Sequence, residues 1–81
     1  MISPVTLSIL RATSETEPRL ASEVRELAGI SDTRRAIVFH VLGELRARGL
    51  VTVDNAAWPP AWSRTERGTE WLAETAEGVE V

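Results

Sequence analysis

The sequence predicts a single domain of the mainly α (α+β) class, in which three helices precede two strands and a last helix. Three observations predict this class. The stretch 31–53 has the pattern of an amphipathic helix that ends at a glycine and continues directly into an alternating strand. Only Ile30 and Ser31 separate Gly29, which ends the preceding helix, from the start of this one, which is typical of a helix-turn-helix. A proline-containing loop then divides two short strand candidates.

The first helix is expected at about residues 3–13. Ser3 is a favourable N-cap residue, and Pro4 fits the first helical position because its missing N–H has no intrahelical partner there. Apolar residues such as Val5 and Ile9 then recur four residues apart, as they do on the buried side of a helix.

The second helix is expected at about residues 20–28. Apolar residues recur at i, i+4 and i+7 from Leu20, and Gly29 marks the end of the helix. For Arg19 and Leu20 two interpretations stay open. They either pair briefly as a strand or lead directly into the helix.

The third helix is expected at about residues 32–48. Ser31 and Asp32 offer side-chain oxygens that can cap its first turn, and Gly49 follows where a left-handed residue is expected to end it. One apolar stripe runs along the helix and consists of Ile37, Val38, Val41, Leu42 and Leu45. A strand at about 50–54 follows at once.

A second strand is expected at about 61–64, after a loop whose two prolines cannot donate ladder hydrogen bonds. Thr65 is the expected N-cap of a last helix at about 66–75. The domain then covers residues 1–76, and residues 77–81 are expected to form a frayed tail. Among the tryptophans, Trp62 and Trp71 are expected in the core.

The formal net charge of −3 is unevenly distributed along the 81 residues. Residues 1–32 hold three Arg and five acids, which gives −2. Residues 33–68 hold six Arg and three acids, which gives +3, and residues 69–81 hold four Glu and no cation, which gives −4. The centre of the chain is therefore basic although the whole is acidic, which permits an anionic partner there. A merely solubilising surface charge remains the plain alternative.

The residue types present argue against an enzyme. The chain has no Cys and one His, and it contains no glycine-rich phosphate loop and no cluster of metal ligands. We therefore expect no catalytic residues, no cofactor and no metal site. The chain also lacks a membrane-spanning apolar run and an opening targeting signal, so a cytoplasmic protein is expected.

Two segments resemble a known family. The run Leu45-Arg46-Ala47-Arg48-Gly49-Leu50-Val51 is similar to the Leu-x-x-x-Gly-Leu-Val signature that closes the recognition helix of MarR-like and PadR-like regulators. The run Trp62-Ser63-Arg64-Thr65-Glu66-Arg67-Gly68 is similar to the aromatic-x-Leu-Thr-x-x-Gly segment that follows their wing. The chain thus resembles the winged helix-turn-helix DNA-binding domains of bacterial and phage transcriptional regulators over about residues 3–74. This implies a three-helix core, a two- or three-stranded β wing and a C-terminal helix.

The resemblance implies that the third helix enters the major groove of double-stranded DNA and that the wing reaches the backbone or the minor groove. Carried over by position, the implied DNA contacts are Ser31, Thr33, Arg34, Arg35, Ala36, Ile37, Phe39 and His40, with Arg64 near the wing. The chemistry of two of them supports this independently. The guanidinium groups of Arg34 and Arg35 suit phosphate oxygens or the O6 and N7 atoms of guanine. A homodimer is expected because a single module buries little surface on DNA.

A second hypothesis is a winged-helix module that binds a protein instead of DNA. The outer face of the third helix is small and partly apolar, and the wing holds Trp58 and two prolines where Arg or Lys is usual. Trp58 either packs back on the wing or projects as a partner anchor. Phe39 either packs in the core or between helices, or contacts a partner. His40 is a surface histidine or a phosphate or base contact. Arg46 and Arg48 are solvated charges or DNA contacts.

Overall fold

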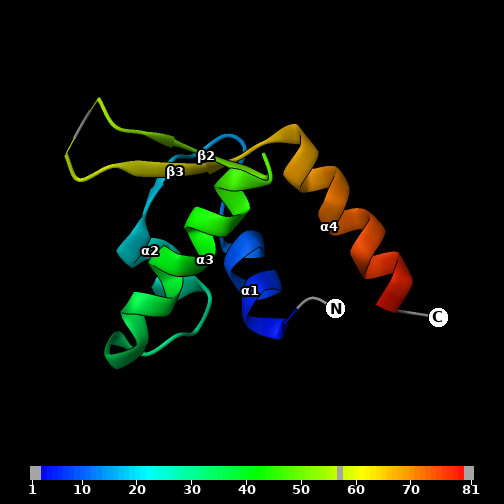
Figure 1. The fold of residues 1–81 in the computed structure, drawn as a ribbon, viewed down its shortest axis with the longest axis horizontal. Helices are drawn as coiled ribbons and strands as arrows, with labels where there is room; N and C mark the ends of the chain where they lie inside the picture. The colour runs from blue at the N-terminus through cyan, green and yellow to red at the C-terminus, as the bar shows by residue number, and fades with distance from the viewer. Residues whose placement is uncertain (1–2, 57, 80–81) are drawn as a thin grey trace.

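The computed structural model describes residues 3–56 and 58–79. In chain order the elements are α1 (Pro4–Ala12), β1 (Arg19–Leu20), α2 (Ala21–Leu27), the 3-10 helix η1 (Asp32–Arg34), α3 (Arg35–Ala47), β2 (Val51–Asp54), β3 (Ala61–Arg64) and α4 (Glu66–Val79). Figure 1 shows the sheet along one side of α1, α2 and α3, with α4 at the end of the molecule opposite the β2–β3 loop. The predicted α+β winged-helix fold class is confirmed.

Helix α1 begins as its sequence predicts. The side-chain oxygen of Ser3 accepts a hydrogen bond from the backbone N–H of Thr6 at 3.2 Å, and Pro4 occupies the first turn. The helix turns Ile9 and Leu10 fully into the core. These two side chains anchor α1 beneath both α2 and α3.

The turn between α2 and α3 is built from backbone hydrogen bonds around Gly29. The N–H of Ile30 donates to the carbonyl of Arg25, and the N–H of Gly29 donates to that of Glu26, both at 3.1 Å. Gly29 has a φ of 75°, which glycine adopts without steric cost. The guanidinium of Arg25 also donates to the carbonyl of Ile30 at 2.8 Å. The helix-turn-helix is therefore fastened at its corner by both backbone and side chain.

The start of the third helix differs from the sequence expectation. Its first turn is the 3-10 helix η1, and regular α-helix begins only at Arg35. Ser31 has the extended backbone of an N-cap, but no side-chain capping bond forms, and its hydroxyl lies 2.9 Å from that of Thr33. The backbone N–H of Arg34 instead bonds to the Ser31 carbonyl at 3.0 Å. A hydrogen bond between residues i and i+3 tightens the turn and gives the backbone N–H an acceptor without a side-chain cap.

The predicted stripe and end of the third helix are confirmed. Four stripe residues, Val38, Val41, Leu42 and Leu45, are buried, whereas Ile37 is only partly buried against the core. Gly49, with a φ of 76°, ends α3 as its left-handed residue. The N–H of Leu50 bonds to the Leu45 carbonyl at 2.9 Å, so the chain leaves the helix directly into β2.

The sheet has three antiparallel strands in the order β1-β3-β2. Strand β1 pairs with β3 through Arg19 opposite Trp62 and Leu20 opposite Ala61, so the three-stranded alternative is correct. Trp62 is buried in the core as expected, and Trp71 is partly buried against it. The central strand β3 therefore packs on the helical core through Trp62.

A tight junction joins β3, α4 and the end of α3. The Thr65 hydroxyl donates to the Gly49 carbonyl at 2.7 Å and accepts from the Gly68 N–H at 3.0 Å, which confirms Thr65 as the cap of α4. A Cβ atom on Gly68 would lie 2.2 Å from the Leu50 carbonyl oxygen. Only glycine fits where α4 meets the chain that enters β2.

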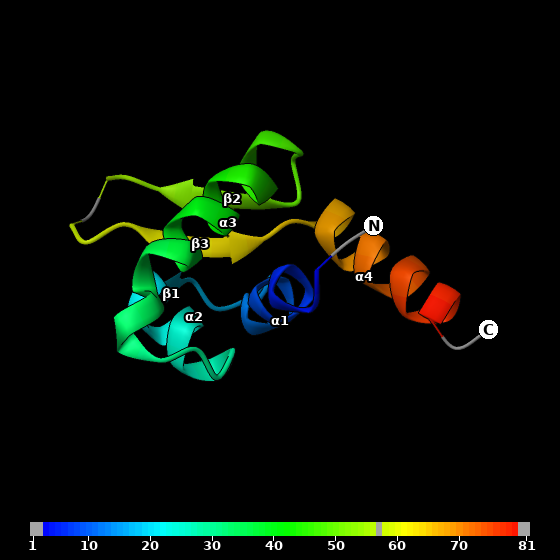
Figure 2. The ribbon, with the colours of Figure 1, turned by 60° about the horizontal axis from the view of Figure 1, so that its bottom comes forward.

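Helix α4 extends to Val79, beyond the predicted end near residue 75, so residues 77–79 of the expected frayed tail are helical. Propagating an existing helix adds one backbone hydrogen bond for each residue fixed, which favours this extension. The remaining tail residues, 80–81, lie outside the described residues. Figure 2 shows α4 leading away from the helix-turn-helix. No helix in the described part of the chain is long and apolar enough to cross a membrane.

Candidate nucleic-acid interface

The surface at the beginning of the third helix is exposed and carries the expected polar groups. All five residues predicted there, namely Ser31, Thr33, Arg34, Arg35 and Ala36, are exposed. They come together because η1 turns sharply out of the helix-turn-helix corner and continues straight into α3. The structure thus presents two guanidinium groups and two hydroxyls at one end of one element.

Arg34 and Arg35 differ in their surroundings. One guanidinium nitrogen of Arg35 lies 3.9 Å from the Asp32 carboxylate, and its side chain is 72% exposed. An ion pair this open contributes about 0.2–1 kcal/mol, so a phosphate can displace it. Among the described residues Arg34 makes no ion pair. It borders a hollow of about 340 Å³ beside Ser31 and the α2–η1 turn. Both cations are available to an anionic partner.

The outer face of α3 carries the small and apolar residues expected from the sequence. Ala36, Phe39 and His40 are exposed, and Phe39 is 56% exposed. Phe39 is therefore not part of the buried core, and the alternatives of packing between helices and of contacting a partner both stay predictions. Ile37 does not belong to this face because it packs partly against the core. The exposed face is centred on Ala36 and His40.

His40 is joined to an acid that the sequence interpretation did not single out. Its Nε2 atom lies 2.8 Å from a carboxylate oxygen of Glu44, and both side chains are mainly exposed. The spacing i, i+4 is a signal that could have identified Glu44, because residues four apart share one helix face. The pair places a carboxylate at the centre of an otherwise uncharged face.

A hollow of about 340 Å³ lies between α2, η1 and α3. It is lined by Ala21, Ser22, Arg25, Asp32, Arg35, Val38 and Phe39. Its polar lining includes the Arg35–Asp32 pair, and its apolar lining includes the ring of Phe39. Arg25 was not predicted as a site residue, and no sequence pattern marks its bond to the Ile30 carbonyl.

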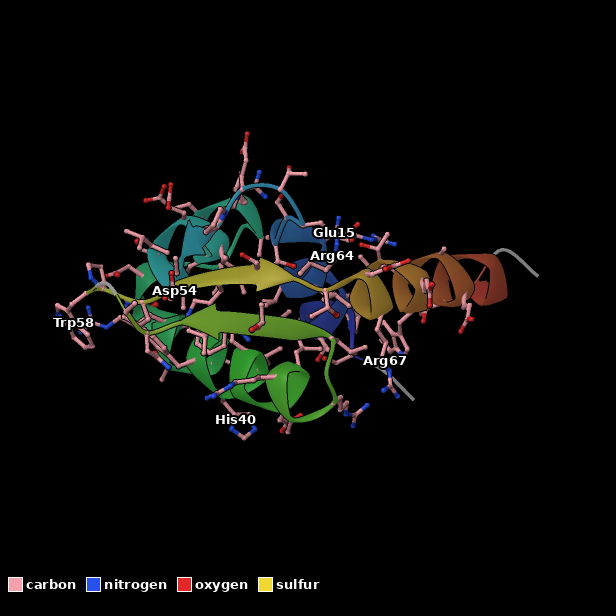
Figure 3. All side chains as sticks on the ribbon, turned by 90° about the horizontal axis from the view of Figure 1, so that it is seen from above. Glu15, His40, Asp54, Trp58, Arg64 and Arg67 are labelled. Carbon is pink, nitrogen blue, oxygen red and sulfur yellow. The ribbon has the colours of Figure 1, made fainter. Side chains whose placement is uncertain are left out.

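The described part of the wing loop turns on Asp54 and carries no cation. A carboxylate oxygen of Asp54 accepts from the Ala56 N–H at 2.9 Å, which shapes the turn after β2. Trp58 is 91% exposed, and Figure 3 shows it at the outer end of the wing, directed away from the body. Trp58 therefore projects from the wing instead of packing back on it, and its role as a partner anchor stays a prediction.

Arg64 lies apart from these groups. Its Nε atom donates to the Thr69 hydroxyl at 3.0 Å, and one of its terminal nitrogens donates to the Leu10 carbonyl at 3.2 Å. Figure 3 shows it at the end of the sheet beside α4, opposite Trp58. From the end of β3 the Arg64 side chain therefore reaches a carbonyl in the last turn of α1 that also accepts from the backbone N–H of Thr13.

The six central arginines do not cluster at one place on the molecule. Arg34 and Arg35 stand at the beginning of α3, whereas Arg46 and Arg48 stand at its end, and the helix has 13 residues. At a rise of about 1.5 Å per residue the two pairs are roughly 18 Å apart. Arg67 lies near Gly49 at the far end as well. Only Arg34 and Arg35 lie at the start of α3, where the other contacts predicted for that helix begin.

In the described residues, no group of three or more acids or histidines is placed to hold a metal ion.

Comparison with known proteins identifies the fold. No protein-family model matches the chain, and no curated protein matches it. Among solved structures, a point mutant of ZitR from Lactococcus lactis superposes with a TM-score of 0.67 at 20% sequence identity. The match covers 99% of this chain and 53% of the ZitR chain, so this chain spans about half the length of that protein. The likeness at this identity establishes a shared fold.

Proposed function

We propose that this chain is a small winged-helix DNA-binding protein, a transcriptional regulator or a phage-type control protein, that places α3 in the major groove. One observation carries the proposal. The exposed start of the third helix presents Arg34 and Arg35 beside the hydroxyls of Ser31 and Thr33. The fold is shared with ZitR, a MarR-family regulator, which supports the same general role. We expect the protein to act in the cytoplasm and to have no enzymatic activity.

The chemistry of the helix start fits the phosphate backbone first and base edges second. Arg34 has no partner among the described residues, and the ion pair of Arg35 is open to water, so both can bind phosphate oxygens. The hydroxyls of Ser31 and Thr33 can donate to the same oxygens once their mutual bond opens. We further propose that His40, farther along the exposed face, leaves its contact with Glu44 to bind a base edge or a neighbouring phosphate.

The net acidity does not oppose this placement, because most of it lies elsewhere. Residues 69–81 hold four Glu and no cation, and Figure 1 shows α4 at the opposite end of the molecule from η1. Charges separated by more than about 8–10 Å in physiological salt interact weakly through solvent. The acidic helix therefore leaves the arginine pair free to attract DNA.

We propose a homodimer as the binding unit, with the twofold contact made by α4 or by the apolar face around Phe39 and Trp58. Two copies double the number of phosphate contacts and set a fixed spacing between half-sites. A contact through α4 keeps both copies of η1 at the outer ends of the pair.

The test is charge reversal at the helix start. Arg34→Glu with Arg35→Glu should abolish binding to a labelled duplex at low salt, because two attractive charges become repulsive. The matched control is Arg46→Glu with Arg48→Glu, which reverses two exposed arginines at the other end of the same helix. The control variant should retain binding, and circular dichroism should show both variants folded. Undiminished affinity in the first double variant would refute the groove placement.

A second candidate function is supported by the exposure of Trp58 and Phe39, at 91% and 56%. Large exposed apolar side chains are typical anchors in protein interfaces. In this alternative the winged helix is an interaction module that does not bind DNA. A soluble partner whose capture is lost with Trp58→Ala and with Phe39→Ala, together with no duplex binding, would favour this candidate.

A further inference from the structure

The wing tip is organised to present one aromatic side chain. Strands β2 and β3 stay paired up to Asp54 opposite Ala61, which holds the two ends of the loop together. The Asp54 carboxylate binds the Ala56 amide, and two prolines follow Trp58. The indole of Trp58 is 91% exposed, more than that of any other large apolar side chain in the described residues. The β2–β3 hairpin therefore carries a large apolar group into solvent.

The wing tip and the start of α3 lie at the same end of the molecule. Figures 1 and 2, which view the molecule from two directions, both place the β2–β3 loop and η1 at the end opposite α4. A partner that binds the start of α3 is thus within reach of the wing. That partner must accept two cations at one point and an uncharged aromatic ring at another. Duplex DNA offers both, since its phosphates are anionic while its sugars and base faces are apolar.

The wing cannot be held on DNA by phosphate attraction. The segment 54–60 contains no Lys or Arg, and its one charged residue is Asp54. The only group in this segment large enough to bury substantial area is Trp58. Apolar side chains in the minor groove are known to contact the sugars or to wedge between base steps, and this contact releases no counterions.

We propose that Trp58 is an uncharged DNA anchor that packs against the deoxyribose or base faces of the minor groove next to the site of α3. This proposal rests on the proposed DNA-binding function and adds the mode of contact at the wing. It divides the interface into two parts. Arg34 and Arg35 supply the salt-dependent attraction, and Trp58 supplies attraction that does not depend on salt.

The first experiment compares salt dependence in the full-length protein. Binding to a random-sequence duplex is measured at several salt concentrations for the wild type, Trp58→Ala, Trp58→Phe and Leu27→Ala. Leu27 is the matched control, because it is an exposed apolar residue on α2. Trp58→Ala should weaken binding about tenfold at every salt concentration with an unchanged log–log slope, as expected for loss of one stacking contact. Trp58→Phe should restore most of the affinity, and Leu27→Ala should match the wild type.

The second experiment follows Trp58 itself. Acrylamide quenching of tryptophan fluorescence is compared between the wild type and Trp58→Phe, so that the difference reports Trp58 and removes the signals of Trp62 and Trp71. Saturating duplex should protect Trp58 from the quencher.

Three results would overturn the proposal while leaving DNA binding intact: unchanged affinity in Trp58→Ala, a changed salt slope in that variant, or full quenching of Trp58 in the complex. Full quenching would leave the wing free for a protein partner. Absence of duplex binding by the wild type would instead overturn the proposed function, so the two failures are distinguishable.

Discussion

At the scale of single residues, two glycines in the described chain carry opposite constraints. A Cβ on Gly68 would meet the Leu50 carbonyl oxygen at 2.2 Å and the Arg64 Cγ atom at 2.9 Å. A Cβ on Gly43, in the middle of α3, would meet nothing within 4 Å. The first position is defined by close packing, whereas the second tolerates a side chain.

Gly68→Ala should therefore destabilise the fold, and Gly43→Ala should stabilise it. We expect a loss of about 1–3 kcal/mol at Gly68, since the backbone of Leu50 must shift. We expect a gain of about 0.5–1 kcal/mol at Gly43, because glycine inside a helix costs about that much relative to alanine. Urea unfolding followed by circular dichroism measures both. A Gly68→Ala variant as stable as the wild type would contradict the close approach of α4 to the end of α3.

At the scale of elements, one side chain connects three of them. Arg64 belongs to β3, and its guanidinium donates to Leu10 at the end of α1 and to Thr69 in α4. The Thr69 hydroxyl in turn donates to Glu15 at 2.8 Å. These bonds fix how α4 leaves the sheet.

Arg64→Ala should lower stability by about 1.5–3 kcal/mol, the usual contribution of hydrogen bonds to charged groups. Arg67→Ala is the control, since it removes an exposed arginine three residues away. Under conditions in which both proteins are folded, the salt dependence of DNA binding should be the same for the Arg64 variant and the wild type. A lowered salt slope with unchanged stability would show that Arg64 contacts phosphate, as the family resemblance implies.

Local chemistry explains which elements could be predicted from the sequence. The end of α3 at Gly49 and its buried stripe are determined by residues close in the sequence, and both were predicted correctly. The pairing of Arg19 with Trp62 and the bond from Arg64 to Leu10 join residues far apart in the chain, so only the folded structure reveals them. The direction of Trp58 likewise depends on how the hairpin is held, which no periodicity encodes.

The candidate site shows the same division. Exposure of the residues from Ser31 to Ala36 follows from their place at the start of a helix, and it was predicted. The burial of Ile37 and the pairing of His40 with Glu44 depend on the rotation of α3 against the core. The distribution of the arginines depends on the lengths and directions of elements rather than on sequence order.

At the scale of the whole molecule, the expected DNA-binding groups and the most acidic segment lie at opposite ends of the long axis. The helix start and the wing tip lie at one end, and α4, which belongs to the most acidic part of the chain, lies at the other. A net charge of −3 therefore says little about the surface that meets a partner. We therefore predict that this acidic protein binds DNA through two arginines in each copy.

The most direct test of this claim is the salt dependence of binding to a random duplex, from about 50 mM upward. We expect the observed association constant to fall linearly on a log–log plot, with a slope of about −2 for each bound copy, because two phosphates are neutralised. Arg34→Gln with Arg35→Gln should bring that slope close to zero. No binding at about 50 mM salt, or a slope that is unchanged in this double variant, would show that Arg34 and Arg35 do not bind DNA.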